Sequence, residues 1–172
     1  VSKSDRRRVR RPLQPDQVRQ LLEATVASEP SFGLSGSERA MIYRLAVETG
    51  LRASELRSLK VSDFDLDGCM VCFHKTKNRK EGELPLRPDT VEELKAIFAS
   101  KLPDAQAFKV PGKPIDMFRP DLEAAGIDYQ DDSERYADFH CLRHTTGSLL
   151  AASGVHPKVA QTIMRHSDIN LT

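Results

Sequence analysis

The stretch His140-Cys141-Leu142-Arg143-His144 is the most informative part of this 172-residue sequence. It lies at the start of an apolar, helix-periodic segment from Phe139 to Ser153, which predicts a helix closed by Gly154. A second helix is predicted to start at Pro157 and to reach about Arg165, because proline is favoured in the first turn of a helix. The stretch therefore opens a two-helix corner and carries two histidines and an arginine.

Two interpretations are compatible with this corner alone. Residues 149–166 are similar in outline to a helix-turn-helix, which would make the protein a DNA-binding regulator. His140 and His144 are one helical turn apart and could share a metal ion. No glutamate follows His140 as in zinc hydrolases, and no third ligand is evident, so we predict no metal site.

A second stretch, Thr49-Gly50-Leu51-Arg52-Ala53-Ser54-Glu55-Leu56, lies between two predicted helices. The first of them runs from about Ser37 to Gly50, a residue suited to a left-handed helix end, and a short one follows from Ser54 to Leu59. Arg52 is therefore expected in a turn. Before them, Pro15 opens a helix whose apolar face holds Val18, Leu21 and Leu22.

The periodicity then changes to that of a small sheet. Asp67-Gly68 is a hairpin-turn signal, residues 69–73 are β-prone, and the polar stretch 75–82 makes a second reversal. Residues 83–86 return as an edge strand, where Pro85 is tolerated. The predicted fold class is mainly α with a small three-stranded antiparallel sheet (α+β).

Helices are predicted to resume after the sheet. Val91, Leu94 and Phe98 share one helical face, with Asp89 or Thr90 as the N-cap. Another helix is expected from around Met117 to Ala125, and residues 127–138 form an acidic loop.

Three cysteines, an odd number, favour a reducing compartment without disulfides. Cys69 and Cys72 could be taken for zinc ligands together with His74. Side chains three apart on a strand point to opposite faces, so we expect a small buried cysteine pair instead.

The charges are unevenly distributed along the chain. The total of 26 Lys+Arg against 25 Asp+Glu gives a net charge of +1, but residues 1–11 hold six bases and one acid, which leaves 20 bases and 24 acids in the body. We interpret residues 1–13 as a basic linker, with phosphate contacts from Arg6, Arg7, Arg8, Arg10 and Arg11. No apolar run reaches the roughly 20 residues that cross a bilayer, and no signal peptide is evident, so a cytoplasmic protein is expected.

The interpretation depends on four motifs that occur together and in a fixed order. They are the Gly-Leu-Arg-x-x-Glu-Leu turn, the hairpin lysine Lys75, the His-x-Leu-Arg-His box and the later Arg165-His166-Ser167. The chain resembles the catalytic domain of the tyrosine recombinase, or phage integrase, family from about Gln14 to Thr172. The resemblance implies a domain at 14–172 preceded by a linker from a further DNA-binding domain. It also implies double-stranded DNA as the partner, no cofactor, and a tetramer on DNA, although an isolated domain could be monomeric.

The resemblance also implies a role for each site residue. Arg52 and Arg143 would hold the two non-bridging oxygens of a DNA phosphate, a task for which two guanidiniums can replace a metal ion. Lys75, with Lys77 as the alternative, would protonate the leaving 5′ oxygen. His140 would accept a proton, and His166 would donate a hydrogen bond to the phosphate. Glu55 would support Arg52, His144 would have a structural role, and Arg165 would add positive charge.

The match has one conspicuous gap. The family's nucleophile is a tyrosine a short way after the second histidine, which places it beyond Thr172, so we interpret the catalytic domain as truncated before it. Tyr43, Tyr129 and Tyr136 lie in other contexts and are not expected to replace it.

The sequence therefore predicts a recombinase or integrase that cuts and rejoins DNA through a covalent 3′-phosphotyrosyl intermediate, without metal or ATP. A regulator that uses residues 149–166, and a metal-dependent nuclease that uses the histidines and the acidic loop, are the alternatives. The arginine pair favours the first, because a regulator has no need of it and a metal nuclease would use carboxylates.

Overall fold

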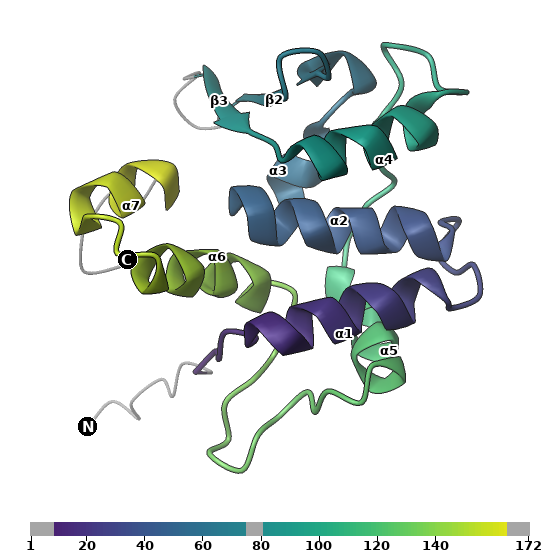
Figure 1. Cartoon of the computed structure of the whole chain (residues 1–172). Coiled ribbons are helices and arrows are strands. Elements are labelled where there is room, and N and C mark those ends of the chain that lie inside the picture. The colour runs from purple at the N-terminus through teal and green to yellow at the C-terminus, as the bar shows by residue number, and fades with distance from the viewer. Residues whose placement is uncertain (1–8, 75–80, 165–172) are drawn as a thin grey trace, which may run out of the picture.

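The computed structural model describes residues 9–74 and 81–164 (Figure 1). Lys75, Lys77, Arg165 and His166, as well as Arg6 to Arg8, lie outside the described residues. The elements in chain order are α1 (Pro15–Val26), α2 (Gly36–Thr49), α3 (Ala53–Ser58), the short helix η1 (Val61–Asp63), β1 (Phe64–Asp65), β2 (Met70–His74), β3 (Glu81–Pro85), α4 (Pro88–Phe98), α5 (Pro114–Ala124), α6 (Cys141–Ala152) and α7 (Pro157–Met164).

Helix α2 is the centre of the molecule, with α4 on one side of it and α1 and α6 on the other (Figure 1). Ile42, Tyr43 and Leu45 of α2 are almost fully buried, and so is Arg39 on another side, so this helix is buried over most of its surface, as expected for a central helix. The mainly helical class with a small sheet is confirmed.

Both ends of α2 are set by local chemistry. Ser35 accepts a hydrogen bond from the Glu38 backbone N–H (3.1 Å), and the Glu38 carboxylate accepts the Ser35 N–H (3.0 Å). At the other end Gly50 has φ +66°, the left-handed conformation predicted from the sequence. Arg52 follows in the turn to α3, as expected.

The three strands form an antiparallel meander in the order β1-β2-β3, so β3 is an edge strand as predicted. Val71 pairs with Phe64 on one side and with Leu84 on the other, and all three side chains are buried. This row attaches the sheet to the helical core.

Three predicted helix starts differ from the structure by two residues or more. Helix α4 begins at Pro88, not after Asp89 or Thr90, because proline supplies the first turn and the Glu48 carboxylate accepts the Arg87 N–H. Helix α5 likewise begins at Pro114, before the predicted Met117. Helix α6 begins at Cys141, two residues later than predicted, where Asp138 accepts the first helical N–H.

The prediction that Cys69 and Cys72 form a small buried pair is wrong. Cys69 and Cys72 are both partly exposed, and Cys141 on α6 is the buried cysteine. Cys69 has φ +53° and belongs to the turn before β2, so only Cys72 has the strand geometry on which the prediction rested.

None of the helices in the described ranges is long and apolar enough to span a bilayer.

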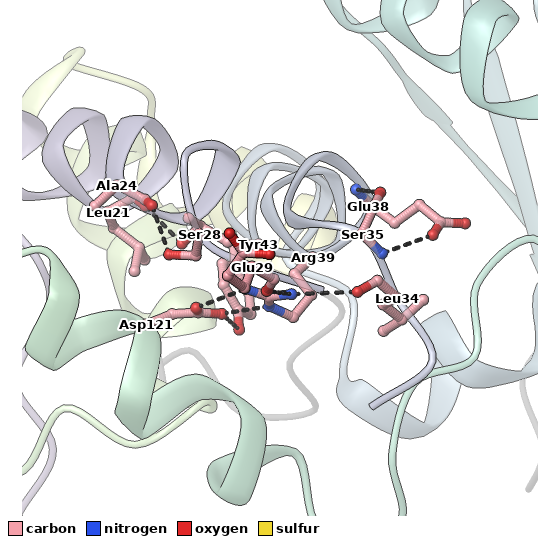
Figure 2. A network of polar contacts seen from close by, with 11 residues as sticks. Leu21, Ala24, Ser28, Glu29, Leu34, Ser35, Glu38, Arg39, Tyr43 and Asp121 are labelled. Carbon is pink, nitrogen blue, oxygen red and sulfur yellow. Dashed lines mark hydrogen bonds and ion pairs between the residues drawn. The ribbon is translucent and has the colours of Figure 1, made fainter. Parts of the chain in front are cut away.

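A buried ion pair ties α5 to α2 (Figure 2). The Arg39 guanidinium donates to both carboxylate oxygens of Asp121, at 2.9 and 3.1 Å, and the Tyr43 hydroxyl donates to the same carboxylate at 2.6 Å. Burial and the neighbouring Asp121 raise the pKa of Tyr43, which keeps its hydroxyl neutral.

Candidate active site

Arg52 occupies the N-cap position of α3 and points partly into solvent. Its backbone N–H donates to Oε2 of Glu55 at 2.8 Å, and its guanidinium lies 3.5 Å from Oε1 of the same carboxylate. The side chain of Arg52 is 47% exposed, whereas that of Glu55 is 10% exposed. A largely buried carboxylate therefore contacts both the backbone N–H and the accessible guanidinium of Arg52.

Arg143 is buried on the first turns of α6. Its guanidinium donates to the carbonyl oxygen of Gly50, at the end of α2, and to that of Met164, at the end of α7. Gly50 is the C-cap of α2, where the last C=O groups lack partners within the helix, and Met164 is the last described residue of α7. Arg143 thereby joins α2, α6 and α7 at one point, where Figure 1 shows the three helices converging.

The two histidines of the box lie next to each other. The rings of His140 and His144 are 5.5 Å apart and meet edge to face. Burial lowers the pKa of His140 to about 4, and the positive charge of Arg10 acts in the same direction. His140 is therefore a neutral imidazole at physiological pH, able to accept a proton.

The predicted basic linker is partly packed against the body. Arg10 forms an ion pair with Asp138, and Arg11 is buried with its guanidinium on the carbonyl oxygen of Asp128. Both of them therefore have partners within the domain that lie more than 100 positions away in the sequence.

The helical corner exists, but it is part of the site. Helices α6 and α7 meet at a turn that contains Gly154, with φ +70°. Because Arg143 binds the last carbonyl of α7, the corner holds the buried arginine in place. Within the described residues no group of three or more His, Cys, Asp or Glu side chains could hold a metal ion.

The three described tyrosines are engaged in contacts within the fold. Tyr43 is buried against Asp121, and the rings of Tyr129 and Tyr136 pack edge to face at 5.5 Å. Of the predicted catalytic and supporting residues, the structure describes Arg52, Glu55, His140, Arg143 and His144, and it joins the Arg52 turn to the box through Gly50. The carbonyl partners of Arg143 and the contact of Arg10 with Asp138 carry no sequence signal.

The chain is similar to known proteins in sequence. The phage integrase family matches residues 11–172. The tyrosine recombinase XerA of Saccharolobus solfataricus is 30% identical over 133 residues, which cover 77% of this chain and 43% of the relative. A tyrosine recombinase of Pseudothermotoga lettingae is 28% identical over 174 residues, which cover 97% and 56%. The chain thus spans about half the length of these curated relatives.

Solved structures show the same fold. A crystal structure of XerA recombinase has a TM-score of 0.74 at 21% identity and covers 95% of this chain, which matches 58% of that chain. The catalytic domain of bacteriophage HP1 integrase has a TM-score of 0.67 at 23% identity, with 94% and 84% covered. With its two arginines, its histidine box and this fold, the chain belongs to the phage integrase family of tyrosine recombinases.

Proposed function

We propose that the protein is a site-specific DNA recombinase or integrase, and that this chain supplies its phosphoryl-transfer site. The observation that carries the proposal is the hydrogen bond from Arg143 to Gly50, which fixes a buried guanidinium beside the turn that presents Arg52. Two cations held by separate helices can face the two non-bridging oxygens of one phosphate.

Strand exchange adds negative charge to those oxygens as phosphorus becomes five-coordinate. Arginine suits this task because its planar fork donates paired hydrogen bonds and keeps its charge at all working pH values. The Glu55 carboxylate would orient Arg52, and the two carbonyls would orient Arg143. The site would thus be preorganised by protein groups.

In the proposed reaction a tyrosine hydroxyl attacks the phosphorus, a new P–O bond forms to the tyrosine, and the bond to the 5′ oxygen breaks. His140, neutral because of its burial, would accept the tyrosine proton. Lys75, or Lys77 if the register differs, would donate a proton to the leaving oxygen. His166 would donate a hydrogen bond to the phosphate.

The nucleophile in this proposal is a tyrosine beyond Thr172. Tyr43 is an unsuitable candidate, because it is buried and engaged with Asp121, far along the chain from the histidine box. The partner would be double-stranded DNA at a specific site, and assembly on it would be tetrameric. A solved relative with a TM-score of 0.74, XerH, is described as bound to its difH substrate.

The test uses the full-length protein and a nicked suicide DNA that carries the recombination site. With EDTA present, we expect a covalent protein–DNA complex that resists denaturation, and we expect Arg143→Ala to abolish it. A DNA-binding regulator would give a shifted band without the covalent complex. A metal-dependent nuclease would cut only when the chelator is omitted.

A further inference from the structure

We propose that Arg10 and Asp138 form a positioning pair for His140, one that fixes the start of α6 and brings the charge of Arg10 near the imidazole. The segment that enters the domain is then part of the site's machinery, in addition to any contact it makes with DNA. The catalytic meaning of the pair rests on the proposed function, whereas its effect on His140 can be measured without it.

The ion pair is well defined. Nε of Arg10 lies 2.7 Å from Oδ2 and 3.0 Å from Oδ1 of Asp138. The Arg10 side chain is 38% exposed and that of Asp138 is 21% exposed. A pair at this depth is less screened than a fully exposed one, so its charges act on their neighbours.

The same carboxylate also starts α6. Oδ1 of Asp138 accepts the N–H of Cys141 at 3.1 Å, and the Asp138 carbonyl oxygen accepts that N–H at 2.8 Å. His140 lies between the two residues that this contact joins. The contact closes the turn that leads into α6, so Asp138 helps to fix the backbone that carries the imidazole.

Several backbone bonds hold Arg10 in this position. The Tyr136 N–H donates to the Val9 carbonyl at 2.8 Å, and the Arg11 N–H donates to the Tyr136 carbonyl at 3.0 Å. Two residues further, the Leu13 N–H donates to Oγ1 of Thr145 on α6 at 2.9 Å. The entering segment is therefore aligned with the histidine box at both ends.

The charges around His140 support the inference. After burial, the nearby charge of Arg10 contributes most to the lowered pKa of His140, ahead of His144 and Arg143, while Asp138 acts in the opposite direction. These are the charged groups that face His140 from the entering segment, the preceding loop and α6. Removing the Arg10 charge should raise the pKa of His140, and removing the Asp138 charge should not.

The test is an NMR titration of the histidine rings in the 172-residue chain. The His140 signal is identified as the one missing from the spectrum of the His140→Gln variant. We expect Arg10→Gln to move the His140 midpoint upward, Arg10→Lys to leave it near the wild-type value, and Asp138→Asn to leave it at or below that value. Asparagine keeps a capping acceptor, so α6 should remain formed. Arg19→Gln is the matched control, because Arg19 pairs with Asp16 at 3.1 Å at an exposed position on α1 and is not among the main groups that shift the pKa of His140.

Opposite or unequal shifts from the two neutralising variants identify a charge effect, since simple loosening would shift the midpoint the same way in both. No shift in Arg10→Gln, or equal upward shifts in both variants, would overturn the proposal. So would an Arg10→Gln variant whose only defect is a weaker salt dependence of DNA binding, which marks a phosphate contact.

The second readout is single-turnover cleavage by the full-length protein. We expect Arg10→Gln to move the acidic limb of the pH–rate profile to higher pH and to slow cleavage about tenfold, a part of the 10²–10⁴ that a general base supplies. An unchanged profile beside a shifted midpoint would overturn the positioning role. If the wild-type protein forms no covalent complex while the midpoint shifts as expected, the proposed function fails and the electrostatic pairing stands.

Discussion

The guanidinium of Arg143 donates to the carbonyl oxygen of Gly50, two residues before Arg52. One hydrogen bond thus links the two arginines of the site, which are 91 positions apart in the sequence. Because Arg143 also binds the end of α7, its side chain serves the fold as well as the chemistry.

Arg143→Lys should therefore cost both stability and activity. A lysine keeps the charge but cannot bridge the two carbonyls in one plane, so we expect a loss of about 2 kcal/mol in the free energy of unfolding. Cleavage should fall by about 100-fold or more. Arg52→Lys is the control: it should lose comparable activity with little change in stability, because Arg52 is half exposed. Equal stability of the two variants in urea titrations would contradict this dual role.

Gly50→Ala should disturb the site through α7. A residue other than glycine at φ +66° costs about 1 kcal/mol, and a Cβ here would lie 3.2 Å from the sulfur of Met164. Gly33→Ala is a matched control, since Gly33 has φ +70° and no atom within 4 Å of such a Cβ. We expect similar losses of thermal stability from the conformation alone, and a loss of cleavage only in Gly50→Ala.

Asp121→Asn should be far more destabilising than Tyr43→Phe. The first leaves the buried Arg39 guanidinium without its carboxylate, at a cost of about 3 to 5 kcal/mol, whereas the second removes one hydrogen bond worth about 1 kcal/mol. The exposed pair of Arg44 and Glu93 gives the reference, because Glu93→Gln should cost less than about 1 kcal/mol. Chemical denaturation of the three variants checks the order.

Stability should fall as the pH drops from 6.5 to about 4, in part because of His140. The folded imidazole has its pKa lowered to about 4, while the unfolded one titrates near 6.5, so in this window the unfolded chain binds the extra proton. Above 6.5 both states are neutral and His140 contributes no slope. His140→Gln should flatten the dependence between these two pH values, and an unchanged slope would show that His140 is not the group responsible.

The sequence predicted the site through local patterns. Gly50 ends α2 in the left-handed conformation that a terminal glycine adopts, so the position of Arg52 in a turn followed from short-range chemistry. The start of α6 was predicted two residues too early, although Asp138 accepts the Cys141 N–H from only three residues away. What no local pattern shows is that the same carboxylate binds Arg10 from 128 positions away. Likewise Pro88 opens α4 while Glu48, on another helix, accepts the preceding N–H.

The total charge also failed to indicate a nucleic-acid partner, because it contains no information on contacts between distant residues. The net charge of +1 hides a basic entering segment, and the structure shows Arg10 and Arg11 of that segment bound to the domain itself. Which cations face a phosphate depends on contacts between distant residues, which a composition does not contain.

The most direct test of the central claim is to remove charge from the phosphate instead of the protein. If Arg52 and Arg143 neutralise the non-bridging oxygens, a suicide DNA with a neutral methylphosphonate at the cleavage position should need them less. With the full-length protein, we predict that Arg52→Ala loses covalent complex formation on the phosphate substrate and regains it on the methylphosphonate. An equal loss on both substrates would contradict the account.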